Sequence, residues 1–286
     1  MFDYFIPLLG ATAISFSMVL AKLVLRDTDA GTFIFFRSFA GLALSLTLLP
    51  FIRVDQAPLF AFLLLALSVV LVPFIMNLFF FSGVRYAGVG TQTAILQSTP
   101  IFVVLSEAAI LNSFAAPAAW FGVTVILSGI AMLVTGRSHV PPRRAVLFGL
   151  AAAAINGVNM VILAVVLRHF SRVALIVAQN AAYATMAGGL FVRAQSRAHK
   201  SARGTELRRV VLMSLLSGLL VQVVFIYLKL TSIERLGSLV TSVLVLAQLP
   251  LTFLFSRLML GERITPQRAF ATVAIVLGAL MVTVAH

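Results

Sequence analysis

Long apolar segments alternate with short polar connections along almost the whole chain. A helix of about 20 apolar residues crosses a hydrocarbon core of roughly 30 Å, and most of the segments have about this length. Backbone in lipid must satisfy its own hydrogen bonds, so each segment is predicted to be a helix and not a strand. The ten predicted spans cover residues 5–25, 30–51, 58–84, 88–111, 116–135, 145–167, 173–192, 210–232, 237–260 and 266–285.

The second half of this pattern repeats the first. Residues 86–100 match residues 236–250, and Val24-Leu25-Arg26 matches Val166-Leu167-Arg168. With one gap, Leu111, Pro117, Phe121 and Gly129 fall on Leu260, Pro266, Phe270 and Gly278. Five helices are an odd number, so the second copy must enter the membrane from the opposite side. The sequence therefore predicts an all-α polytopic membrane protein with ten transmembrane helices as two inverted five-helix repeats, residues 1–136 and 145–286, joined by a linker at 137–144.

Composition supports a membrane protein and excludes several other classes. The mean hydropathy is +1.11 with 61% hydrophobic and 10% charged residues, too apolar for a soluble globule. The net charge of +13 comes from basic residues scattered between apolar segments, so it indicates topology and not nucleic-acid binding. Cysteine is absent and the four histidines lie in connections or at the end, so no metal or cofactor is predicted. The predicted partners are the lipid bilayer and a small-molecule substrate, with the chain as a monomer or homodimer.

The basic residues also predict an orientation. Lys22, Arg37 and Lys229 lie deep inside predicted spans and are not counted. Of the other lysines and arginines, 14 lie in or next to the odd-numbered connections and 4 in or next to the even-numbered connections. The positive-inside rule then places the odd connections in the cytoplasm and both termini outside. The first apolar segment has no basic flank and is predicted to be a retained span of a protein in a bacterial inner (plasma) membrane.

The repeated motifs resemble those of the EamA family of the drug/metabolite transporter superfamily. The motifs are Phe35-Phe36-Arg37, Thr99-Pro100-Ile101-Phe102, Leu249-Pro250-Leu251-Thr252 and Leu260-Gly261-Glu262-Arg263-Ile264-Thr265. The first half departs from the family pattern, because Leu111-Asn112-Ser113 replaces the Leu-Gly-Glu ending. The resemblance implies a carrier of amino acids, other metabolites such as vitamins, or amphipathic drugs. It also implies a cavity lined by the first four helices of each half, with peripheral fifth and tenth spans. Many similar carriers have both termini inside, which conflicts with the charge count.

Arg37 is the most informative charged residue, since an arginine inside a span is costly unless it meets water or a partner. Two interpretations remain open. Its guanidinium could bind a carboxylate or phosphate of the substrate through paired hydrogen bonds. Alternatively, it could be a packing or gating cation satisfied by backbone carbonyls, or one that snorkels to the interface.

Other polar residues at membrane depth indicate a partly polar interior. Each of them could contact substrate or could join helices, and Lys229 could also snorkel. Asn156 and Asn159 are three residues apart and share one helix face. The candidate substrate-binding residues are Arg37, Asn77, Gln92, Asn156, Asn159, Gln179, Tyr227 and Lys229.

Three further residues have mechanistic interpretations. Glu107 is the one carboxylate placed inside a predicted span, so it is a candidate for proton coupling, with a mouth-lining or ion-paired role as the alternative. Pro100 and Pro250 remove backbone donors at matching positions and are candidate hinges, although static kinks at proline are common.

These features predict a secondary carrier that works by alternating access through a cavity between the repeats. A non-transporting receptor or scaffold and a channel are the alternatives. An enzyme is not predicted, because the sequence contains no paired aspartates, Ser/His pair or histidine-rich metal motif at membrane depth.

Overall fold

The computed structural model describes residues 2–24, 28, 30–52, 57–70, 75–87, 89–112, 116–135, 142–195, 204–261 and 266–284. The described residues form helices and short connections and contain no extended strand, which confirms the prediction of an all-helical chain. The motif residues 262–265 and most of the predicted linker, 137–141, lie outside the described ranges.

The described residues of the first half form seven α-helices. It begins with η1 (Phe2–Tyr4), α1 (Phe5–Val24), α2 (Ala30–Leu46), η2 (Leu49–Phe51) and α3 (Leu59–Val70). It continues with α4 (Asn77–Ala87), α5 (Val89–Leu96), α6 (Thr99–Leu111) and α7 (Pro117–Thr135). The predicted spans at 58–84 and 88–111 are therefore each divided into two helices.

The second half contains α8 (Arg143–Val166), α9 (Arg172–Gln195), α10 (Gly204–Gly218) and the π-helical segment η4 (Leu219–Phe225). It continues with α11 (Ile226–Leu244), η5 (Val245–Ala247), α12 (Gln248–Leu260) and α13 (Pro266–Val284). Each of the ten predicted spans contains helix. By length and composition, four of the described stretches can cross a membrane, Phe5–Val24, Gln92–Leu111, Arg143–Val166 and Arg208–Leu260.

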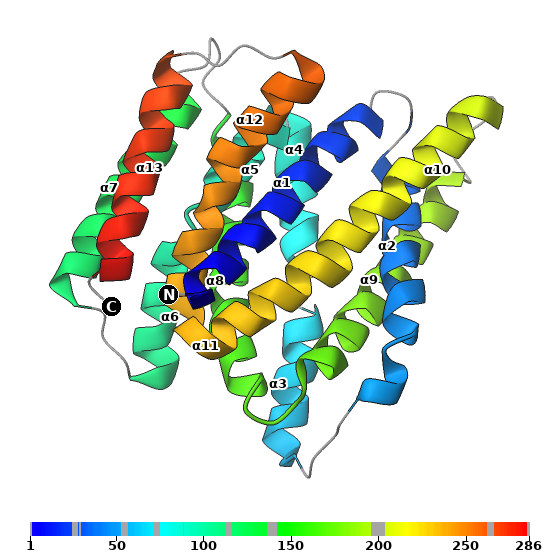
Figure 1. Ribbon diagram of the computed structural model, residues 1–286, viewed down its shortest axis with the longest axis horizontal. Helices are drawn as coiled ribbons and strands as arrows, with labels where there is room; N and C mark the ends of the chain where they lie inside the picture. Colours follow the sequence, from blue (N-terminus) through cyan, green and yellow to red (C-terminus); the bar gives the residue numbers. More distant parts are fainter. Residues whose placement is uncertain are drawn as a thin grey trace.

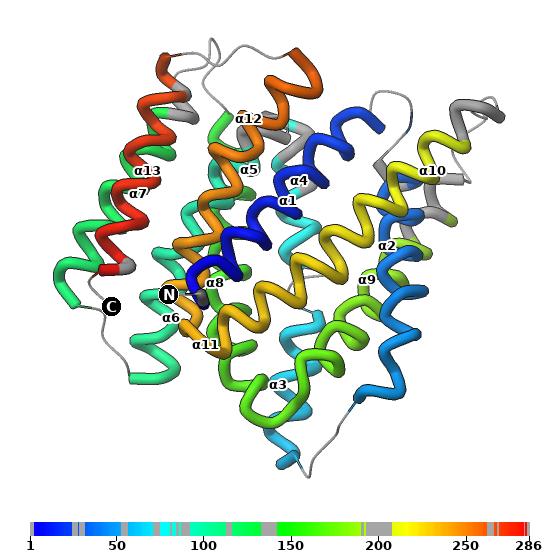
Figure 2. Tube along the Cα trace, in the orientation of Figure 1, coloured from blue at the N-terminus to red at the C-terminus, as the bar shows by residue number. Residues whose placement is uncertain are grey.

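The last of these stretches, Arg208–Leu260, is not one straight helix. Gly237 has φ 83° and ψ 169°, outside the helical region. Figure 2 shows that the chain reverses direction within α11, between α10 and α12. Glycine suits this position because it adopts positive φ without a steric cost from Cβ. The stretch is 53 residues long, more than twice what one crossing needs, and it consists of two antiparallel arms.

Helix ends follow local sequence signals at matching positions in the two halves. Pro117 and Pro266 are the first residues of α7 and α13, where a missing backbone N–H has no helical partner to lose. Asn112 and Gly261 end α6 and α12 in the left-handed conformation, with φ of 50° and 66°. Asparagine is the second choice after glycine for such a cap, so the first-half departure from Leu-Gly-Glu preserves the helix ending.

The helices form a slab in which α7 and α13 lie side by side at one edge, away from α2, α9 and α10 (Figure 1). The fifth and tenth spans are therefore peripheral, as the resemblance implies. A buried apolar layer fills the end of the slab where α8 ends and α9 begins. Its members include Val166, Leu175, Leu230, Ile233 and Val243, each at most 2% exposed. These residues belong to a larger buried cluster that extends to α7 and α13, and we interpret their end of it, on the side of the even connections, as the closed end of the molecule.

Candidate functional site

A cavity of about 260 Å³ lies in the middle of the slab. It is lined by α1, α2 and the α4–α6 region of the first half, and by α8, α9, η4 and α11–α12 of the second. Its volume is close to the lower end of the roughly 300–1,000 Å³ that is usual for small-molecule sites. The wall thus comes from the first four predicted spans of each half.

Six of the eight candidate substrate-binding residues line this cavity. They are Arg37, Asn77, Asn156, Asn159, Gln179 and Lys229. Sequence separation between them reaches almost two hundred residues, so their convergence is a result of the fold. Whether they contact substrate stays a prediction.

Arg37 contributes the guanidinium of the wall. It lies 5.8 Å from the centroid of the Phe33 ring, measured from Cζ, at cation–π distance. Tyr183 lies within electrostatic range of Arg37 and forms a side-chain hydrogen bond with Asn77. Among the described residues, no carboxylate lies within ion-pair distance of Arg37, and its Nε has no hydrogen-bond partner. This half-buried cation therefore has aromatic neighbours and no counter-ion in the described part of the chain.

Several side-chain amides of the wall also have unused hydrogen-bonding capacity. Gln97 Nε2, Asn159 Nδ2 and Oδ1, Gln222 Oε1 and Gln248 Oε1 are buried without partners within the described ranges. Asn156 differs, because its Nδ2 donates to Thr99 Oγ1 at 3.2 Å. Buried polar atoms are normally paired, and such orphans in a cavity are positions for water or a polar ligand.

The π-helical segment η4 shapes one side of the cavity. A π-helix displaces carbonyls from the ordinary i→i−4 pattern, and here Asn180 Nδ2 donates to the Gln222 carbonyl at 3.1 Å and to the Gly41 carbonyl at 3.3 Å. A Cβ on Gly41 would lie 1.9 Å from Gln222 Oε1, so glycine is needed for α2 to approach η4. Gln222 Nε2 donates to Ser38 Oγ at 3.4 Å. Asn180 thus holds α2 and η4 together behind Arg37.

The remaining wall is mostly apolar and adaptable. Lys229 shares it with Phe225, Leu230 and Ile226, and no hydrogen bond or ion pair is formed by Lys229 among the described residues. Methionines contribute from four elements, Met18, Met76, Met160 and Met186. Methionine side chains fill irregular gaps and tolerate different ligand shapes.

Gln92 and Tyr227 lie outside the cavity lining. Gln92 is fully buried, and its Nε2 donates to the Ala145 carbonyl at 2.7 Å, which joins α5 to α8. Tyr227 is 43% exposed on the other face of α11. Periodicity alone could not separate these two from the lining residues, because both are polar at the same depth.

Glu107 is also outside the cavity and has a helix-capping arrangement. Its Oε1 accepts hydrogen bonds from the Ser238 hydroxyl and from the Leu239 N–H, the latter at 3.2 Å. Leu239 begins the second arm after the break at Gly237, so a carboxylate there compensates the exposed N–H groups of a helix start. The geometry gives Glu107 a structural partner in place of a position on the solute path.

The two candidate hinge prolines follow breaks in the helices. Pro100 lies in the first turn of α6, directly after the turn at Gln97 and Ser98. Pro250 is the third residue of α12, after the 3₁₀ segment η5. In these positions the missing N–H breaks no bond inside a continuous helix. The interruption lies before each proline, and a hinge role remains a prediction.

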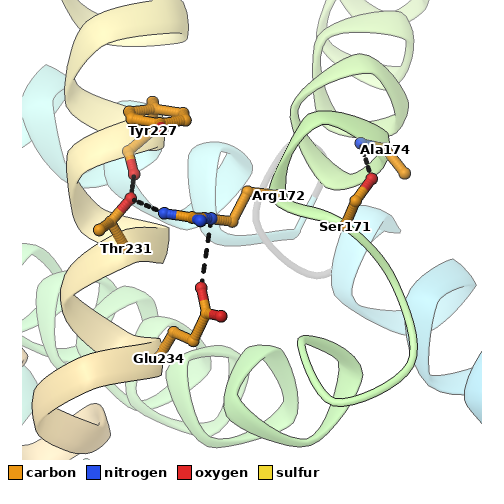
Figure 3. Close-up of polar contacts among 6 residues, drawn as sticks. All are labelled: Ser171, Arg172, Ala174, Tyr227, Thr231 and Glu234. Atoms are coloured by element: carbon orange, nitrogen blue, oxygen red, sulfur yellow. Dashed lines mark hydrogen bonds and ion pairs between the residues drawn. The ribbon is translucent and has the colours of Figure 1, made fainter. Parts of the chain in front are cut away.

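A polar cluster joins α9 to α11 at the closed end of the cavity (Figure 3). Arg172 Nε lies 3.2 Å from Glu234 Oε2, and Arg172 Nη1 donates to Thr231 Oγ1 at 2.9 Å. The guanidinium carbon also lies 5.5 Å from the centroid of Tyr227. These contacts lie next to the apolar layer around Leu230 and Ile233, and they clamp the same end of the molecule.

Several polar residues of the predicted spans line the cavity but are not among the eight candidates. They are Gln97, Tyr183, Gln222 and Gln248. Ser38 and Ser242 were missed entirely, since serines in apolar segments usually bond to their own helix backbone. Proximity to Arg37 in α2 was the available signal for Ser38.

Comparisons with known proteins agree with this architecture. The sequence profile of the EamA-like transporter family matches residues 1–135 and again residues 143–284. A solved crystal structure superposes with a TM-score of 0.71 at 19% identity, covering 98% of this chain and 97% of that chain, which shows a shared fold. The search of curated protein sequences finds no match.

The apolar helices and the central cavity with its few polar groups are those of an integral membrane transporter of the drug/metabolite type. The chain belongs to the EamA-like transporter family. Members of this family are transporters and not enzymes.

Proposed function

We propose that the chain is a ten-span secondary carrier that moves small organic solutes by alternating access through the central cavity. The observation that carries this proposal is the cavity itself, which lies in the middle of the slab, is lined by both halves and is provided with unpaired polar groups. Binding at the interface between two repeats lets one site face either side of the membrane in turn.

The packing of the helices supports two repeats. In the first half α1 packs against α10, η4, α11 and α12, and in the second half α8 packs against α4, α5 and α6. Each first span thus lies against the third and fourth spans of the opposite half. The family profile, which matches twice, divides the chain at the same place.

The contact between α7 and α13 supports inversion of one repeat relative to the other. A Cβ on Gly122 would lie 2.8 Å from the Gly278 carbonyl, and a Cβ on Gly129 would lie 2.8 Å from the Ala271 carbonyl. Under the sequence repeat, Gly129 corresponds to Gly278 and Gly122 to Ala271, so exchanging the halves converts one contact into the other. Residue numbers rise along one helix as they fall along the other, and the pair is antiparallel. Equivalent helices run antiparallel when repeats are inverted.

The closed end supports an assignment of the conformation. The apolar layer and the Arg172–Glu234 ion pair lie on the side of the even connections, so entry is from the side of the odd connections. If the positive-inside count is correct, this is an inward-facing state of a bacterial inner-membrane protein with external termini.

Reconstituted vesicles test the proposal. Vesicles that contain the purified protein are loaded with one unlabelled solute from a panel of amino acids, vitamins and organic ions. The same solute in labelled form is then added outside the vesicles. A carrier exchanges the two with saturable kinetics and faster entry when solute is present on the far side. Arg37→Ala is expected to abolish exchange, and Arg257→Ala, an exposed arginine of α12, serves as the matched control.

The two alternative functions give different results in the same vesicles. A channel conducts without saturation or acceleration by solute on the far side, and a receptor or scaffold binds solute without moving it. Either result overturns the carrier.

A further inference from the structure

Charge in the cavity is unbalanced. Arg37 and Lys229 are the charged side chains among its described lining residues, and both are cations. Neither is paired with a carboxylate in the described part of the chain, where the ion pairs are Arg172–Glu234 and Arg235–Asp3. A cation away from bulk water is costly unless an anion or several hydrogen-bond acceptors approach it. A ligand is the remaining source of negative charge for this site.

The two cations occupy different depths. A Cβ on Gly218 would lie 2.3 Å from the Arg37 carbonyl oxygen, so the backbone of Arg37 lies beside residue 218. Lys229 is 11 residues farther along the same arm, which corresponds to at most about 16 Å, because the π-helical segment η4 rises less per residue than an α-helix. The ligand that fits is therefore an anion at Arg37 with its body extending toward Lys229, whose positive charge adds attraction over a longer range.

Arg37 has the better geometry for direct contact with the anionic group. Its planar fork binds a carboxylate through two parallel hydrogen bonds, whereas lysine is a point charge. The unpartnered Nε of Arg37 and Nε2 of Gln97 are buried donors on this wall. Apolar side chains beside them, including Phe80, Phe225 and Met76, suit a ligand body of aromatic or aliphatic character.

We propose that the cavity binds small amphipathic carboxylates of net negative charge, with the carboxylate on Arg37. This assignment deepens the proposed carrier function and rests on it only for the movement of the ligand across the membrane. Organic cations are disfavoured because they would meet two like charges. Zwitterions are disfavoured because among the described lining residues there is no carboxylate to hold an ammonium group.

Four probes with one carbon skeleton test the charge preference. They are 3-phenylpropionate, 3-phenylpropanamide, 3-phenylpropylamine and L-phenylalanine, which are anionic, neutral, cationic and zwitterionic at neutral pH. Binding to the purified full-length protein is measured by calorimetric titration, because protonated weak acids cross lipid unaided and obscure flux. The anion is expected to bind on the order of tenfold more tightly than each of the other three, which is the worth of one charge-assisted hydrogen bond.

Variants assign the contact to a residue. Arg37→Gln is expected to remove the advantage of 3-phenylpropionate over the amide, and Lys229→Gln is expected to reduce it by a smaller factor. Arg37→Lys keeps the charge without the fork and should give an intermediate affinity, which separates loss of contact from loss of folding. Arg257→Gln is the control and should bind as the wild type does.

Three results overturn the assignment. They are equal or tighter binding of any of the other probes, no binding of the anion, and an anion preference that survives in a folded Arg37→Gln protein. Binding is independent of transport, so the two proposals fail separately. Carboxylate binding without exchange in vesicles refutes the carrier alone, and saturable exchange without charge preference refutes the carboxylate site alone.

Discussion

Removing the Arg172 guanidinium should open the closed end of the cavity. Arg172 joins α9 to α11 through an ion pair with Glu234 and a hydrogen bond to Thr231, next to the apolar layer (Figure 3). In Arg172→Gln the side chain keeps a hydrogen-bond donor but loses the positive charge and the several N–H donors of the planar guanidinium. The conformation in which the cavity faces the even connections should then become more populated.

The magnitude follows from the exposure of the partners. The side chains of Arg172 and Glu234 are 32% and 47% exposed, so solvent screens the ion pair and it contributes roughly 0.2–1 kcal/mol. The hydrogen bond to Thr231 adds about 1 kcal/mol, and the contact with the Tyr227 ring adds about 0.5 kcal/mol. A total of about 2 kcal/mol corresponds to a shift of roughly 30-fold between the two conformations.

Cysteine labelling measures this shift directly, because the chain contains no cysteine of its own. Ser242→Cys places a single thiol in the cavity wall at the buried end. A membrane-impermeant maleimide is applied to each face of sealed vesicles, and the labelling rate from the even-connection face is compared with and without Arg172→Gln. The rate from that face should rise by about the ratio given above.

Arg235 offers a matched control on the same face. Its Nη1 donates to Asp3 Oδ1 at 2.6 Å, but this pair joins η1 to α11 and does not bridge α9 and α11. Arg235→Gln should leave the labelling pattern unchanged. Equal labelling rates in Arg172→Gln, Arg235→Gln and the unmodified reporter would refute the view that Arg172 stabilises closure.

Three further substitutions test parts of the structure. Gly278→Ala puts a Cβ 2.6 Å from a carbonyl oxygen of α7 and should lower the free energy of unfolding by about 1–3 kcal/mol. Gly189→Ala, where the added Cβ meets open space, should not lower it. Equal effects of the two substitutions in denaturation curves would contradict the close packing of α7 and α13. Glu107→Ala removes the acceptor for the Leu239 N–H and should lower the stability of this helix start by about 0.5–2 kcal/mol, measured as faster hydrogen exchange of the Leu239 amide. A change confined to the pH profile of transport would support proton coupling instead. Asn180→Ala leaves the carbonyls of Gly41 and Gln222 without their donor and should lower the free energy of unfolding by about 1–3 kcal/mol in the same assay. An unchanged free energy of unfolding would show that the π-helical segment needs no such support.

The sequence identified most of the candidate site residues, but it did not show that they lie together in one cavity. Arg37, Asn156 and Asn159 stand out because polar residues are expensive in lipid, and that cost can be judged without a structure. Their convergence on one cavity depends on how helices from two halves cross. Gln92 has the same polarity and depth, yet it packs between α5 and α8, since the direction of a side chain is set by its neighbours.

The sequence by itself determined the membrane environment, the helical structure of the spans and their repeat, because the need for apolar length and internal backbone hydrogen bonds acts on each segment separately. It also determined the helix ends at Pro117 and Pro266, which depend on local backbone geometry. Only the tertiary structure decided that Glu107 caps a broken helix, that Arg172 clamps one end and that Arg37 lies without a counter-ion in the described cavity wall. The contacts of Arg172 and Glu107 join groups that are at least 59 residues apart in the chain, and pairing over such separations is settled by packing and not by local pattern.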